Sequence, residues 1–182
     1  GETTENYTGP TPPYKELDGS GKYTWVKAPR YAGRPAEVGP LARMLVGYGQ
    51  GQKEIVSTVD LVLKTLGAPA SALFSTLGRT AARGIETLLM SQKNFEWLSM
   101  LAANIKSGDL RVHAGERWEP STWPAKCQGV GFHEAPRGML SHWVVIENGK
   151  IANFQAVVPS TWNASPRDAK GQRGPYESAL IG

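Results

Sequence analysis

The stretch "ALFSTLGRTAARGIETLLMSQKNFEWLSMLAANIKSGD", Ala72 to Asp109, gives the strongest indication of the fold. Its apolar side chains recur at the spacings of an amphipathic helix. They are Leu73, Leu77, Ile85, Leu88, Leu89, Phe95, Leu98, Leu101 and Ile105. With Ser71 or the preceding turn as its cap, the pattern predicts one helix over residues 71–106. Such a helix is roughly 50 Å long at 1.5 Å per residue, so we expect it to pack across a large body of protein.

The chain before this helix divides into a loop region and a helical region. Residues 1–36 are rich in Gly and Pro, which predicts loops, with one short strand expected at Tyr23–Lys27. Between Glu37 and Leu66 the apolar residues recur at helical spacings and are interrupted by "GYGQG" at residues 47–51. We therefore expect two helices that flank a loop.

After the long helix the pattern changes to loops and short strands. Two apolar runs, Trp143–Ile146 and Ile151–Val158, flank Asn148-Gly149, a pair that favours a tight two-residue turn. They predict a β-hairpin, whereas the preceding "CQGVGFHEAPRGMLSHW" is expected to form a loop. The tail is expected to be loop with a turn of helix near its end. The prediction is thus a mainly α, α+β fold: a long-helix bundle with a C-terminal β-hairpin and extensive loops. Its regions, 1–36, 37–109 and 110–182, form one domain or part of one larger domain.

Composition limits the classes of function. Of the 182 residues 40% are hydrophobic and 20% charged, which is typical of a globular protein. No apolar run approaches the roughly 18 residues of a membrane span, and the first residues lack the pattern of a signal peptide. The net charge of +4 is spread along the chain, so we expect no nucleic-acid partner. A single cysteine excludes an internal disulfide and a cysteine-ligated cluster held by this chain alone.

The candidate site lies in "FHEAPRGMLSHW". Proline fixes its own backbone dihedral and favours an extended residue before it, while Gly138 accepts close approach or a positive dihedral. Arg137 is therefore presented on a stiff, bent support, although a surface salt bridge remains an alternative. His133 and His142 lie nine residues apart, which is no zinc spacing. Cys127 fits a lone loop cysteine.

The segment "VVPSTWN" follows the predicted hairpin. The hydroxyls of Ser160 and Thr161 either donate hydrogen bonds to a buried anion or close a turn. The local sequence favours the turn but leaves both interpretations open.

Four stretches taken together carry a family resemblance. They are "KYTWVKAPRY", "GVGFHEAPRGMLSHW", "NGKIANFQAVVPSTWNASPRD" and "GPYESALIG", which closely resemble the C-terminal half of the large subunit of nickel-iron hydrogenases. The resemblance implies an enzyme that oxidises H2 or reduces protons at a nickel-iron centre. In that family the iron carries two cyanides and one carbon monoxide, and two CxxC pairs hold the metals. Neither pair is present in this sequence, so the resemblance implies no nickel or iron ligand here, and Cys127 matches neither pair.

The resemblance assigns roles to residues around such a centre. Arg137 matches the arginine above the open metal position, which acts as a base in H2 cleavage or organises it. Ala135 and Pro136 would line the pocket of the diatomic ligands, and Ser160 would donate to one cyanide, as the backbone around Arg137 would to the other. The backbone carbonyl of Ala156 matches a ligand of a structural Mg²⁺.

The resemblance also implies partners, and two alternative functions stay open. Expected partners are the rest of the large subunit, a small subunit with iron-sulfur clusters and, in the membrane-associated uptake group, a membrane cytochrome b on the periplasmic side. One alternative is a noncatalytic relative, either an H2 sensor or a quinone-site subunit of a respiratory complex. Another is a metal-free helical interaction module.

Overall fold

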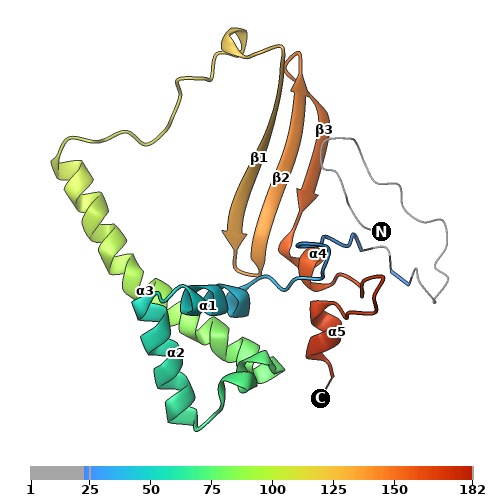
Figure 1. Ribbon diagram of the computed structural model, residues 1–182. Helices are drawn as coiled ribbons and strands as arrows, with labels where there is room; N and C mark the ends of the chain where they lie inside the picture. The colour runs from blue at the N-terminus through green and yellow to red at the C-terminus, as the bar shows by residue number, and fades with distance from the viewer. Residues whose placement is uncertain (1–22, 25, 182) are drawn as a thin grey trace.

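The computed structural model describes residues 23–181 apart from Trp25. Three α-helices come first, followed by a three-stranded sheet and two short helices (Figure 1). The elements are α1 (Pro40–Gly49), α2 (Lys53–Leu66), η1 (Ala70–Phe74), α3 (Thr76–Lys106), η2 (Pro120–Thr122), β1 (Lys126–Ala135), β2 (Gly138–Glu147), β3 (Lys150–Val157), α4 (Pro159–Asn163) and α5 (Pro175–Ala179). The predicted mainly α, α+β class is confirmed.

The hydrophobic core lies where α1, α2 and η1 pack against the first half of α3. Its buried members come from all four elements and are Leu41, Met44, Val59, Leu73, Ala82, Ile85 and Leu89. The two predicted helices before α3 are confirmed, and the break between them falls at residues 50–52. α1 begins with Pro40, whose fixed dihedral and missing N–H suit the first helical position.

The long helix is confirmed, but it begins later than expected. Its cap is Ser75, whose hydroxyl accepts a hydrogen bond from the backbone N–H of Gly78 at 3.0 Å. Ser71, the expected cap, lies within the 3₁₀ turn η1. Gly78 allows this turn to lie directly on the helix, because a Cβ there would be 2.2 Å from the carbonyl oxygen of Ala72.

The second half of α3 projects away from the core (Figure 1). Its large apolar side chains are half or more exposed; they include Phe95, Trp97, Leu98, Met100, Leu101 and Ile105. The described residues thus cover only the first half of a helix that was expected to pack along its whole length. Within residues 23–181, no helix is both long and apolar enough to cross a membrane.

The sheet is antiparallel with the order β1-β2-β3. The predicted hairpin is confirmed: Asn148 and Gly149 join β2 to β3 with φ values of 51° and 72°, as a tight turn of this kind requires. The loop expected before it is wrong, because residues 126–135 form β1 and pair along their whole length with β2. These residues form a strand because they pair with β2. Almost all of them are exposed, and two of them are glycines, so their own composition does not favour a strand.

Two further expectations differ from the structure. The short strand at Tyr23–Lys27 is wrong, since residues 23, 24, 26 and 27 form no strand and a β-bridge joins Tyr31 to Arg34 instead. The tail does contain the expected turn of helix near its end, α5, but α4 was not predicted. Together α4 and α5 place the tail beside the turn that ends β1 (Figure 1).

Candidate functional site

The centre of the candidate site is the two-residue turn Pro136-Arg137 between β1 and β2. Ala135 and Gly138 form the last pair of the two strands, so Ala135 has the extended conformation expected before a proline. Gly138 is buried and has a φ of 133°, which confirms both uses predicted for it. A Cβ there would lie 2.8 Å from the backbone nitrogen of Gly39, so the turn lies directly against the start of α1.

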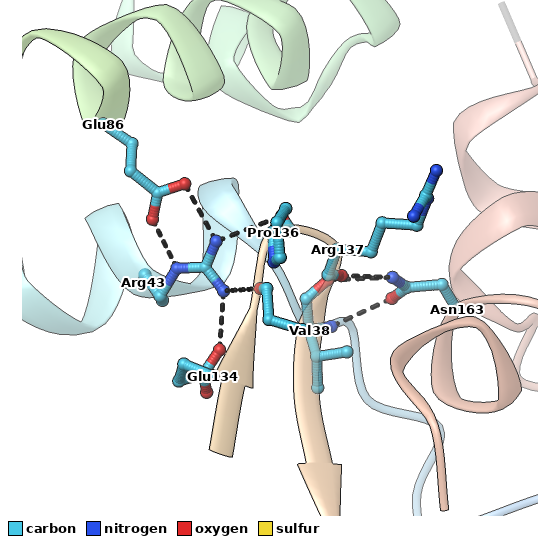
Figure 2. Close-up of polar contacts among 8 residues, drawn as sticks. Val38, Arg43, Glu86, Glu134, Pro136, Arg137 and Asn163 are labelled. Atoms are coloured by element: carbon cyan, nitrogen blue, oxygen red, sulfur yellow. Dashed lines mark hydrogen bonds and ion pairs between the residues drawn. The ribbon is translucent and has the colours of Figure 1, made fainter. Parts of the chain in front are cut away.

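Asn163 at the end of α4 joins this turn to the segment before α1. Its side-chain oxygen accepts a hydrogen bond from the N–H of Val38 at 2.9 Å, and its amide nitrogen donates to the carbonyl of Val38 at 2.9 Å. The same nitrogen donates to the carbonyl of Arg137 at 3.3 Å. Asn163 is buried, with 9% of its surface exposed, so these bonds are shielded from water (Figure 2).

Arg43 of α1 holds the same turn from its other side. It donates to both carboxylate oxygens of Glu86 on α3, one at 2.8 Å, and to Glu134 of β1 at 2.6 Å. It also donates to the carbonyls of Ala135 at 3.1 Å and Pro136 at 3.2 Å (Figure 2). The hydrogen bonds that Arg43 donates to Glu86 raise the pKa of Arg43 and outweigh the opposite effect of burial, and the hydrogen bond to Glu134 adds to the rise. Arg43 therefore stays charged.

The side chain of Arg137 extends away from Arg43 (Figure 2). It is exposed, and its guanidinium makes no hydrogen bond or ion pair with any of the described residues. The surface salt bridge considered for it is therefore absent from this part of the chain. Arg137 lies at a cleft of about 200 Å³ whose walls include Arg83 and Tyr176. A fork of guanidinium donors thus extends from a fixed turn at the edge of this cleft.

The other predicted site residues lie near this turn on different elements. Ala135, the last residue of β1, is half-buried, and Pro136, the first residue of the turn, is exposed. Ser160 is exposed near the start of α4, three residues before Asn163 and hence on the same side of that helix. Its hydroxyl has no hydrogen-bond partner within residues 23–181. Ala156 lies in β3 opposite His142 and is exposed.

The described residues contain no set of metal ligands. Among them no group of three or more His, Cys, Asp and Glu side chains could hold a metal ion. Cys127 is exposed on β1 as a free thiol, and the ring of His142 lies against Phe154, with the ring centres 5.5 Å apart. A metal at this site would need ligands from another part of the protein.

Two residues that build the site were missed from the sequence. Arg43 contacts Glu134 across 91 residues of sequence, and Asn163 contacts Val38 across 125. No local pattern indicates either contact. Arg43 occupies an ordinary position in a helix, whereas Asn163 stands in the noticed segment "VVPSTWN" and could have been considered as a polar partner for the turn.

Comparison with known proteins identifies the family. A family model described as nickel-dependent hydrogenase matches residues 1–182. The uptake hydrogenase large subunit of Rhizobium leguminosarum bv. viciae is 49% identical over 180 residues, which are 99% of this chain and 30% of that protein. The hydrogenase-1 large chain of Escherichia coli K12 is 48% identical over 92% of this chain and 28% of its own length.

Solved structures agree with the sequence comparison. The [NiFeSe]-hydrogenase of Desulfomicrobium baculatum superposes with a TM-score of 0.66 at 37% identity, over 96% of this chain and 34% of that chain. The chain therefore spans about a third of the length of the relatives that it matches. Since the family model covers every residue and the relatives match almost the whole chain, the chain belongs to the nickel-dependent hydrogenase family.

Proposed function

We propose that this chain forms the outer wall of the metal centre in the large subunit of a nickel-iron uptake hydrogenase. The complete protein would interconvert H2 with protons and electrons. The observation that carries the proposal is the presentation of Arg137: its side chain has no partner among the described residues, while its backbone is held by Asn163 and by close contact with Gly39. A charged donor fixed in this way is suited to act on a group that other parts of the protein supply.

The residues present fit the edge of a nickel-iron centre. They offer no ligand set, but Arg137 and Ser160 are two donors without partners among the described residues, on elements joined through Asn163. Cyanide bound to iron is a hydrogen-bond acceptor that is costly to bury unpaired, so such donors suit it. When bound, the centre supplies the position at which H2 is polarised and from which its electrons leave.

The role of this chain's residues follows from their chemistry. The guanidinium of Arg137 would stand at the open side of the centre, where its fixed charge and paired donors orient the reacting group and help to move a proton. Pro136 and the half-buried Ala135 would exclude water on the side of the diatomic ligands. The hydroxyl of Ser160 would donate to one cyanide, and the backbone carbonyl of Ala156 would bind Mg²⁺ together with ligands from elsewhere.

The partners of the complete protein are part of the same proposal. The rest of the large subunit would cover the exposed apolar half of α3, and a small subunit with iron-sulfur clusters would carry the electrons away. A relative in Wolinella succinogenes named quinone-reactive Ni/Fe-hydrogenase supports an electron path toward quinone, for which we propose a membrane cytochrome b as the carrier. We place this assembly on the periplasmic side of the cytoplasmic membrane.

Native mass spectrometry of the intact protein with elemental analysis tests the proposal directly. We expect a complex with a second subunit, nickel and iron in near-equal amounts at the site, and additional iron from the clusters. A purified full-length protein that binds neither nickel nor iron would contradict the proposal. Cell fractionation of the same strain checks the periplasmic location.

A Ser160→Ala variant tests the proposed contact with cyanide. Because the change removes one hydrogen-bond donor, we expect one of the two cyanide stretching bands in the infrared spectrum of the intact enzyme to shift. The metal content should stay at the wild-type level. Ser178→Ala, which alters an exposed serine of α5, is the matched control and should leave both bands in place. Unchanged bands in Ser160→Ala would contradict the assignment.

A further inference from the structure

The backbone at the β1–β2 turn is held at three consecutive carbonyl groups. Arg43 donates to the carbonyls of Ala135 and Pro136, and Asn163 donates to the carbonyl of Arg137. Side chains from two different helices, α1 and α4, therefore fix the path of the chain up to and including the arginine (Figure 2). Two of these three bonds come from a single guanidinium.

We propose that Arg43 is a positioning residue for Arg137, which it orients by holding the two carbonyls that precede it. This inference rests on the function proposed above for Arg137. Arg43 has no contact with the Arg137 side chain, so it acts through the backbone alone. Loss of its two bonds would let the turn pivot about Asn163, and a displacement of about 1 Å at a reacting group is enough to cost a large factor in rate.

The shape of the contact requires an arginine. The Nη1 atom serves one oxygen of Glu134 and the carbonyl of Ala135, while Nη2 serves Glu86 and the carbonyl of Pro136. This arrangement uses the flat fork of the guanidinium, in which the directions of the N–H groups are fixed. A lysine at the same position carries the charge but only three donors on one atom, so it cannot reach two carboxylates and two carbonyls together.

The charges around Arg43 explain why its hold on the turn is firm. Both carboxylate oxygens of Glu86 accept hydrogen bonds from Arg43, so the guanidinium is held against α3 independently of its bonds to the turn. Glu86 and Arg43 are both about one-fifth exposed, whereas Glu134 is half exposed. The pair between α1 and α3 is thus the better shielded part, and the carbonyls of the turn are bound to a group that is already fixed.

The test compares Arg43→Lys with Lys93→Met in the intact enzyme. Lys93 of α3 is the control, because it too joins α3 to another helix, through an ion pair with Glu54 of α2 at 3.2 Å, but it neither contacts the turn nor lines the cleft at Arg137. We expect Arg43→Lys to lower kcat at least about tenfold, and Lys93→Met to stay within about twofold of the wild type. The backbone amides of residues 137–139 should exchange hydrogen faster in Arg43→Lys alone.

The outcomes separate this inference from the function on which it rests. Equal kcat and equal amide exchange in the two variants would overturn the positioning role of Arg43. If Arg137→Lys itself keeps full turnover, the catalytic role proposed for Arg137 fails, while the exchange data still decide whether Arg43 holds the turn. Should Arg43→Lys not accumulate as folded protein, Glu86→Gln gives the same test. It weakens the anchor of Arg43 and is expected to give a smaller loss of kcat in the same direction, and no loss would overturn the inference.

Discussion

On the function proposed above, an Arg137→Lys variant of the intact protein is expected to lose H2 turnover by about 100-fold or more, the usual size of effect when a fixed donor at a reacting group is removed. Lysine keeps the positive charge but replaces a flat fork of donors with a single ammonium group on a flexible stem. The side chain of Arg137 has no partner within residues 23–181, so its loss should leave the surrounding structure in place. H2 oxidation assays with an artificial acceptor, alongside nickel and iron analysis, measure the effect.

The control for this variant is Arg117→Lys. Arg117 is an exposed arginine in the segment between α3 and η2. This segment lies away from the turn between β1 and β2 (Figure 1), so the replacement of Arg117 should leave turnover unchanged. Undiminished turnover in a fully metallated Arg137→Lys enzyme would remove the catalytic role of this arginine. The remaining proposal would then be that the turn only closes the pocket.

The second large effect is expected at Gly138. A Cβ at this position would lie 2.4 Å from Cγ2 of Val38 and 2.8 Å from the backbone nitrogen of Gly39, and the φ of 133° strains any residue with a side chain. Gly138→Ala should therefore destabilise the protein by about 3 kcal/mol and push the turn away from α1. We expect the melting temperature of the intact protein to fall by about 2 °C, with a loss of turnover.

Comparison with Gly149→Ala separates the effect of backbone strain in Gly138→Ala from the effect of its close contacts with Val38 and Gly39. Gly149 also has a positive φ, 72°, but a Cβ there would meet no atom within 4 Å. Gly149→Ala should lower the free energy of unfolding by only about 1 kcal/mol. It should leave turnover intact, because the turn between β2 and β3 lies at the opposite end of β2 from Arg137. Equal effects of the two substitutions would show that the contact between the turn and α1 is unimportant.

The elements that could be predicted are those whose cause is local. The helical spacing from Leu73 to Ile105 and the Asn148-Gly149 pair each contain their own physical reason, and both predictions are confirmed. Strand β1 was missed because its stability comes from pairing with β2 and not from its composition, which includes Gly129 and Gly131. The cap of α3 was expected at Ser71 or the preceding turn because Leu73 fits the helical spacing, although Leu73 lies in the 3₁₀ turn η1.

In the site, too, the features with a local cause could be predicted and those that depend on distant residues could not. The bend at Pro136 and the role of Gly138 were predicted from backbone sterics, which act between neighbouring residues. The family resemblance, confirmed by the comparisons, supplied Arg137, Ser160 and Ala156, whose roles stay predictions. Arg43 and Asn163 could be found only in three dimensions, because their partners lie 91 and 125 residues away in sequence.

The way in which the turn is held has a consequence for how the site can change. All three side-chain hydrogen bonds at residues 135–137 end on main-chain oxygens, and every residue type carries a main-chain oxygen. The scaffold is therefore indifferent to which side chain stands at position 137. Evolution or a protein engineer could place a shorter donor, an acid or a synthetic amino acid there and inherit the same geometry, so that the reactivity of the pocket can vary while its architecture is preserved.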